Sequence, residues 1–113
     1  MSARLTSQML IGALVRRAQE AGGSAMVLHK GEAISGTLLV QLVDHGTHLG
    51  FVERMTGLSG KTELVPAGPG DGSQQVEIMS YIDRRTGSDP DIWILELDVA
   101  EGQRLVADIL CGA

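Results

Sequence analysis

Length, composition and charge confine this chain to the class of small globular proteins. With 113 residues and 43% hydrophobic side chains, it can bury one core of ordinary domain size but not two. A formal net charge of −5 repels polyphosphates, and only three residues are aromatic, so the composition argues against nucleic acid as a partner.

The first predicted element is an amphipathic helix at residues 7–21, where apolar residues recur at helical spacing. Its predicted buried face consists of Leu10, Ile11, Leu14, Ala18 and Ala21. Arg17 falls on the border of that face, so its aliphatic stem can pack while its guanidinium stays in water. Gly22 and Gly23 then end the helix, because glycine adopts the left-handed conformation at little cost.

Runs of Val, Leu and Ile after this helix predict an antiparallel sheet. We expect residues 25–29 and 34–43 to pair as a hairpin that turns at Gly31. Residues 49–55 then add a third strand, and residues 62–65 a short fourth one. These strands together would form a meander.

A second helix is predicted after the glycine- and proline-rich loop that follows the fourth strand, with Asp71 or Ser73 as its cap. Tyr81 is expected to point into solvent. The predicted buried side of this helix consists of Val76, Ile78, Met79 and Ile82. The helix is expected to end before Pro90, because the residue preceding a proline disfavours helical geometry.

The chain closes with a strand at residues 92–97 and a short segment at residues 101–111. Alternation along the strand places Trp93, Leu95 and Leu97 on one face and Ile92, Ile94 and Glu96 on the other. Asp98 and Glu101 have the spacing of a capping box, which favours a helix over a strand for the last segment.

The order of these elements predicts the fold class. We expect a single α+β domain over residues 1–113, built as an antiparallel β-meander with two main helices and a further C-terminal strand and short helix.

One segment resembles a nucleotide-binding loop but lacks two of its parts. Residues 57–62 end in Gly-Lys-Thr, as P-loops do, yet Met55 stands where the first glycine is required. Pro66 also prevents the helix that a P-loop must open. We interpret the segment as a glycine-rich turn and expect no cofactor.

The three histidines and the single cysteine are the candidates for metal-binding or reactive groups. His29 lies about 30 Å of strand away from His45, so only His45 and His48 could share a metal ion. Two ligands in an exposed turn are fewer than a zinc centre uses, and we assign no metal site, although the sequence leaves the question open. Cys111 has no histidine near it in sequence, so we assign no catalytic residue.

Charged and aromatic side chains flank elements that must pack together, and they form the candidate ligand-binding set. Its members are Arg16, Arg17, Asp89, Asp91 and Trp93. A structural interpretation pairs Arg17 with Asp89 or Asp91 and lays Trp93 over the first helix. The alternative is a polar site that binds a ligand among these groups.

Three segments resemble those of a small protein family. They are residues 16–23, residues 27–32 with Gly36, and residues 89–97, which begin Asp-Pro-Asp-Ile-Trp. In this order they resemble domain-of-unknown-function family fourteen ninety-one, and the Asp-Pro-Asp-x-Trp segment is the most specific part. The resemblance implies a bacterial, chiefly alphaproteobacterial, origin. It transfers no catalytic residue, because the family has no assigned activity.

We expect a non-enzymatic binding or interaction module, because the apolar share is high and no complete catalytic set is present. The expected partner is a second copy or another protein, bound through a sheet edge or through residues 105–110. The alternative is a small enzyme or ligand-binding protein that uses the polar set around Arg17, Asp89, Asp91 and Trp93. A lone cysteine and an N-terminal apolar stretch too short to span a bilayer predict a cytoplasmic protein with no membrane partner.

Overall fold

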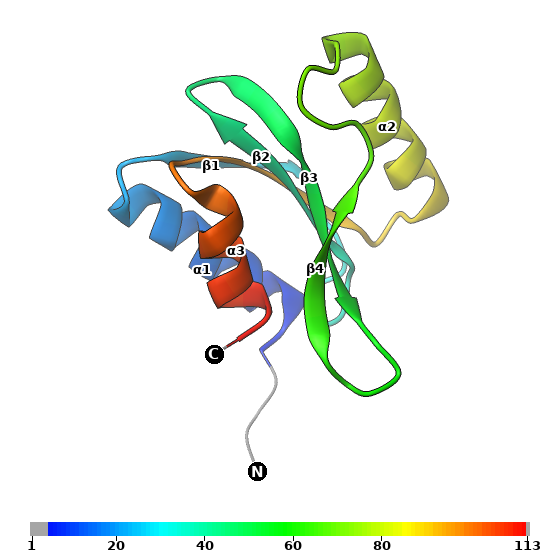
Figure 1. The fold of residues 1–113 in the computed structure, drawn as a ribbon. Helices are drawn as coiled ribbons and strands as arrows, with labels where there is room; N and C mark the ends of the chain where they lie inside the picture. Colours follow the sequence, from blue (N-terminus) through cyan, green and yellow to red (C-terminus); the bar gives the residue numbers. More distant parts are fainter. Residues whose placement is uncertain (1–4, 113) are drawn as a thin grey trace.

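The structure, a computed structural model, describes residues 5–112 as a five-stranded sheet with three helices (Figure 1). In chain order the elements are α1 (Ser7–Glu20), β1 (Ser24–His29), β2 (Leu38–Asp44), β3 (Thr47–Thr56), β4 (Thr62–Ala67), α2 (Gln75–Ser88), β5 (Trp93–Asp98) and α3 (Gly102–Leu110). The strands lie in the order β1-β5-β2-β3-β4. Helices α1 and α3 pack on one face of the sheet, and α2 packs on the other. The predicted α+β class is confirmed.

Strand β5 lies between β1 and β2, so the predicted hairpin of β1 with β2 is wrong. Leu95 of β5 is aligned with Val27 of antiparallel β1 and with Val40 of parallel β2. The residues of β5 from Trp93 to Leu95 are at most 3% exposed. A strand that is apolar on both faces is best stabilised at the centre of a sheet, where both faces are covered. The segment at residues 30–37 therefore spans the inserted strand and is not a tight turn.

Strands β2, β3 and β4 form a meander, so the predicted meander is confirmed for these strands and wrong for β1. The turn from β2 to β3 uses His45 and Gly46, both with positive φ. In the turn from β3 to β4 the backbone N–H of Gly57 donates to the carbonyl oxygen of Lys61 at 2.9 Å. The segment that resembles a P-loop is therefore a hairpin turn, as we interpreted it.

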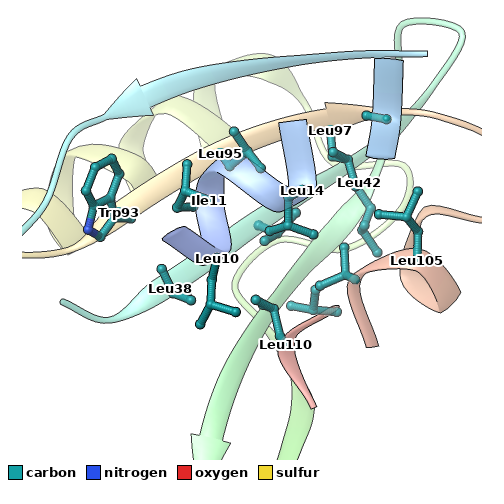
Figure 2. Packing of buried hydrophobic residues seen from close by; sticks show 14 of the residues in the cluster. Leu10, Ile11, Leu14, Leu38, Leu42, Trp93, Leu95, Leu97, Leu105 and Leu110 are labelled. Atoms are coloured by element: carbon teal, nitrogen blue, oxygen red, sulfur yellow. The ribbon is translucent and has the colours of Figure 1, made fainter. Parts of the chain in front are cut away.

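Helices α1 and α3 enclose the larger core against the first face of the sheet (Figure 2). The buried residues of α1 include Leu10, Ile11, Leu14 and Ala18, as predicted, and the sheet contributes Leu38, Leu42, Trp93, Leu95 and Leu97. Burying one Leu or Ile side chain contributes about 1.5–3 kcal/mol to stability. This layer is therefore the main source of the fold's stability.

The C-terminal segment is helical, which settles the choice between helix and strand as predicted. Its residues Leu105, Val106 and Leu110 are buried in the larger core, so this segment is not the exposed apolar face that we expected for self-association. The predicted capping box of Asp98 with Glu101 is wrong. The carboxylate of Asp98 accepts hydrogen bonds from the backbone N–H groups of His45 and Gly46, both at 2.9 Å, and so ties the end of β5 to the turn after β2.

Helix α2 packs on the second face through Ile78 and Ile82, as predicted, and also through Tyr81, which was expected to point into solvent. Ile78 and Tyr81 are buried, whereas Val76 and Met79 are 68% and 56% exposed. The ring of Tyr81 packs on that of Phe51 with 5.0 Å between centroids. An aromatic pair of this kind stabilises a contact that helical spacing alone does not reveal.

The start of α2 also differs from the prediction. Its N-cap is Gln74, whose backbone N–H donates to the side chain of Glu77 at 3.1 Å, and not Asp71 or Ser73.

Near the C-terminal end of α2, Arg85 donates to Glu53 of β3 at 3.0 Å and to the Tyr81 hydroxyl at 2.7 Å. Glu53 raises the pKa of Arg85 above its ordinary value, mainly through this hydrogen bond. Helix α2 is thus held on the sheet by this ion pair and by the smaller core, to which Ile78, Tyr81 and Ile82 contribute.

Within residues 5–112, none of the helices has the length and apolar character needed to cross a membrane.

Candidate functional site

The structure does not bring the predicted ligand-binding residues together. Ser7, at the start of α1, donates to the carbonyl oxygen of Gly36 at 2.7 Å, and Gly36 lies against the carbonyl oxygen of Asp91. Arg17 lies ten residues further along α1, about 15 Å along the helix axis. Arg16 and Arg17 are exposed there, and no ion pair among residues 5–112 joins Arg17 to Asp89 or Asp91. The expected structural pairing is therefore wrong.

Asp89 and Asp91 shape the turn that leads into β5. The Asp89 carboxylate accepts from the backbone N–H of Asp91 at 3.1 Å, and its carbonyl oxygen accepts from that of Ile92 at 3.2 Å. Asp91 accepts through its carbonyl oxygen from the backbone N–H of Glu32 at 3.0 Å. These contacts give both aspartates a local structural role.

Trp93 is 3% exposed and packs in the larger core beside α1 (Figure 2). Its position over the first helix agrees with the structural interpretation of this residue. Its indole is not free to line an open site from this position.

Each of the three histidines forms hydrogen bonds with its own separate partners. His29 bonds through Nδ1 to the carbonyl oxygen of Ile92 at 2.7 Å, and His45 bonds through Nδ1 to the Asp44 carboxylate at 2.8 Å. His48 uses both ring nitrogens, because Nδ1 is 2.9 Å from the Gln41 amide nitrogen and Nε2 is 3.0 Å from the Pro69 carbonyl oxygen. A neutral His48 held in this way has no lone pair left for a metal ion.

Cys111 lines a hollow of about 520 Å³ between the start of α1, the β3–β4 hairpin and the end of α3. Burial raises the pKa of the Cys111 thiol above its ordinary value. A raised pKa leaves less thiolate near neutral pH, so Cys111 is a poor nucleophile. The hollow borders both ends of the described range, residues 5–112.

A cleft of about 280 Å³ lies between α2 and the second face of the sheet. Strands β2 and β5 contribute Gln41, Val43, Glu96 and Asp98 to its lining, β1 contributes Leu28, and α2 contributes Gln75, Ile78, Met79 and Ile82. No Lys or Arg lines the cleft among the residues that the structure describes. The cleft therefore combines apolar side chains with acidic and amide acceptors.

A chain of hydrogen bonds fixes the amide of Gln41 in this cleft. The Pro69 carbonyl oxygen can only accept, so Nε2 of His48 carries the proton and Nδ1 accepts from the Gln41 amide nitrogen. Gln41 is only 6% exposed, and its Oε1 makes no hydrogen bond with residues 5–112. Every wholly enclosed side-chain oxygen in that range has a partner, so solvent must reach Oε1.

The outer edge of β1 adjoins the cleft through Leu28. This edge strand has the sequence Ser-Ala-Met-Val-Leu-His, with no charged residue and no proline. Its exposed apolar side chains are Met26 at 57%, Val27 at 43% and Leu28 at 36%. The opposite edge strand, β4, contains Glu63 and Pro66, which hinder pairing with another strand. The β1 edge is therefore more open to pairing with another strand than the β4 edge.

Comparison with known proteins places the chain in a family. The model of the family described as "Protein of unknown function (DUF1491)" matches residues 5–107. The chain belongs to the DUF1491 family. No curated protein matches it.

Solved structures of similar proteins have the same fold as this DUF1491 chain. A crystal structure and an NMR structure of a DUF1491 protein from Caulobacter crescentus are both 29% identical to it, with TM-scores of 0.77 and 0.75. They cover 90% and 92% of this chain and 94% of their own. A solution structure from A. tumefaciens, 24% identical over 98% of this chain and 96% of its own, has a TM-score of 0.70 and supports the fold alone.

Two of the segments that resembled DUF1491 meet at one junction in the structure. Glu32 accepts from the Trp93 indole at 2.8 Å through its carbonyl oxygen and donates its backbone N–H to Asp91. A Cβ atom at Gly31 or Gly36 would overlap the Asp91 carbonyl oxygen. The most specific part of the resemblance therefore describes how the chain enters β5, and it explains architecture and not chemistry.

The cleft residues Gln41, Glu96 and Met79 were missed as site residues in the sequence. Gln41 did carry a signal, because it is the one polar residue in the run Leu38–Val43, which is otherwise apolar. A polar side chain in a central strand needs partners and marks a position worth testing. Met79 carried no such signal, since its spacing placed it on the buried side of α2.

Proposed function

We propose that this DUF1491 protein is a non-enzymatic interaction module that forms a homodimer through the outer edge of β1. One observation carries the proposal: β1 presents an unpaired, uncharged strand edge with three consecutive exposed apolar side chains. Exposed edges of this type pair with a further strand, whose backbone groups complete the ladder. The bulge between Val27 and His29 limits the pairing to a short segment.

Antiparallel pairing of two β1 strands is chemically self-complementary. A twofold axis through the strand pair brings Met26, Val27 and Leu28 of each copy against the same residues of the other. Because β1 carries no charge, pairing places no like charges directly opposite one another. These features favour a second copy as the occupant of the edge.

The non-enzymatic part of the proposal rests on the state of the reactive side chains. Burial makes Cys111 a poor nucleophile, and both nitrogens of His48 are engaged. The candidate polar set is also split between the two ends of α1. We place the protein in the cytoplasm of an alphaproteobacterium, supported by its single cysteine and by its relatives from Caulobacter crescentus and A. tumefaciens.

Sedimentation equilibrium of the parent protein and two lysine variants tests the proposal. Met26→Lys places two like charges close together across the twofold axis, and Met26 is exposed enough for the monomer to tolerate the change. Leu58→Lys is the matched control, because Leu58 is wholly exposed in the β3–β4 turn and distant from β1.

We expect the parent and Leu58→Lys to be dimeric at hundreds of micromolar and Met26→Lys to be monomeric there. A monomeric parent at that concentration, or a Met26→Lys variant as dimeric as the parent, would overturn the proposal. Circular dichroism of Met26→Lys checks that loss of the dimer is not loss of the fold.

A further inference from the structure

We propose that the cleft between α2 and the sheet binds a cation that carries N–H donors on an aliphatic stem, such as an alkylguanidinium or alkylammonium group. The acceptors are the Glu96 carboxylate and Oε1 of Gln41. This inference goes beyond the proposed homodimer, because it concerns the second face of the sheet and not its edge. Pairing through β1 would extend the sheet sideways, and the two proposals share only Leu28, which lines one end of the cleft.

The first argument is the orientation of Gln41. The chain from Pro69 through His48 directs the amide nitrogen of Gln41 toward Nδ1 of His48. Its Oε1 is therefore left as an acceptor in a side chain that is 94% buried, because Gln41 is 6% exposed. Because solvent reaches this oxygen, water can donate to it in the free protein, and an N–H group of a ligand can replace that water as the donor.

The second argument is the position of Glu96. Gln41 and Glu96 are aligned across the parallel pair of β2 with β5, and both line the cleft. Glu96 makes no hydrogen bond or ion pair through its side chain with residues 5–112. One neutral and one charged acceptor on adjacent strands match a cation with several donors, and charge-assisted hydrogen bonds are the stronger ones.

The third argument is the lining around these acceptors. Leu28, Val43, Ile78 and Met79 give the cleft an apolar part that suits methylene groups. No basic side chain among the described residues lines it, and the net charge of −5 adds an attractive field for a cation. A volume of about 280 Å³ lies at the lower end of ligand clefts, so the occupant is a small molecule or a single side chain.

NMR titration with n-butylguanidinium chloride tests the site. We expect saturable shifts of the Gln41 side-chain amide and the Met79 methyl group, and smaller, non-saturating shifts with neutral 1-pentanol. Parallel titrations with n-butylammonium and with N-acetyl-arginine amide distinguish the sources of the cation. Tighter binding of the arginine derivative favours a side chain of a protein partner, and tighter binding of the free cations favours a small amine; either result supports the site.

Two charge-neutralising variants make the test specific. Glu96→Gln keeps the shape of the cleft and should weaken binding of n-butylguanidinium about tenfold, the loss expected for one charge-assisted bond. Glu63→Gln removes the same charge from β4 and should bind like the parent. Absence of saturation with every cation, or equal weakening in both variants, would overturn the inference, because the protein's overall charge would then explain any response.

Discussion

The indole Nε1 of Trp93 donates a hydrogen bond to the carbonyl oxygen of Glu32 at 2.8 Å, across 61 residues of sequence. This bond joins the connection after β1 to the start of β5. Because β5 is the strand inserted between β1 and β2, the junction helps to determine the strand order of the whole sheet. It also joins two of the segments by which the chain resembles its family.

Substitution of Trp93 should separate packing from hydrogen bonding. We expect Trp93→Ala to lower the free energy of unfolding by about 3–5 kcal/mol, because a large buried side chain is lost. Trp93→Phe keeps most of the packing but removes the donor, and should cost less, with about 1–2 kcal/mol from the lost bond to Glu32. Urea unfolding followed by circular dichroism measures both. A loss below about 1 kcal/mol for Trp93→Ala would contradict the structural role of this residue.

Alanine at Gly36 should be poorly tolerated, because its Cβ would overlap the Asp91 carbonyl oxygen, and backbone cannot move away as a flexible side chain can. Gly87→Ala is the matched control, since nothing lies within 4 Å of a Cβ there and the residue is in helix α2. We expect Gly87→Ala to stabilise by about 0.5–1 kcal/mol and Gly36→Ala to destabilise by more than that. Thermal melts of the two variants measure both effects. A Gly36→Ala variant as stable as the parent would contradict the close approach of Gly36 to the Asp91 carbonyl oxygen.

The carboxylate of Glu32 predicts a pH dependence of stability. Backbone N–H groups of Ile34 and Ser35 donate to it and lower its pKa below the ordinary value of 4.5. The ionised form therefore contributes stability above about pH 4.5, and this contribution is lost as the pH falls through the lowered folded pKa. The parent should lose more stability than Glu32→Gln between pH 6 and pH 3, as measured by urea midpoints. Equal losses of stability in the parent and in Glu32→Gln would show that Glu32 is not the source of this pH dependence.

Two arginines should behave differently when replaced by alanine. Arg17 is exposed and in no ion pair with the described residues, so Arg17→Ala should change stability by no more than about 0.5 kcal/mol. Arg85→Ala leaves Glu53, whose side chain is 17% exposed, without its partner and should cost about 1–3 kcal/mol. A loss of more than about 1 kcal/mol for Arg17→Ala would contradict the exposed, unpaired position of this side chain.

The sequence predicted the elements better than their arrangement. Periodicity located α1 and, except for the exposed C-cap Ala21, its buried face, because helical spacing of apolar residues depends only on local sequence. Periodicity did not predict the partner of β1, which is β5 and not β2. Strand pairing depends on segments far apart in the sequence, and β5 comes more than 60 residues after β1. The predicted buried side of α2 was right for Ile78 and Ile82 but wrong for Val76, Met79 and Tyr81. The contact of Tyr81 with Phe51 and the bond of Arg85 to Glu53 turn the helix away from its aliphatic pattern.

The candidate site was harder to predict than the fold. The polar set was chosen from charged residues near element ends, and such residues mostly form turns, as Asp89 and Asp91 do here. The cleft depends on how far α2 covers the sheet, which no local pattern encodes. Gln41 alone gave a usable sign, as a polar residue in a buried strand.

Hydrogen exchange of the β1 backbone amides tests the central claim, pairing of two β1 edges, most directly. In antiparallel pairing with β5, part of the β1 amides point inward and the others point to the open edge. We predict that the outward amides exchange slowly at hundreds of micromolar protein, exchange faster on dilution, and exchange fast at every concentration in Met26→Lys. Fast, concentration-independent exchange of the outward amides in the parent protein would contradict strand pairing, even if light scattering detected a dimer.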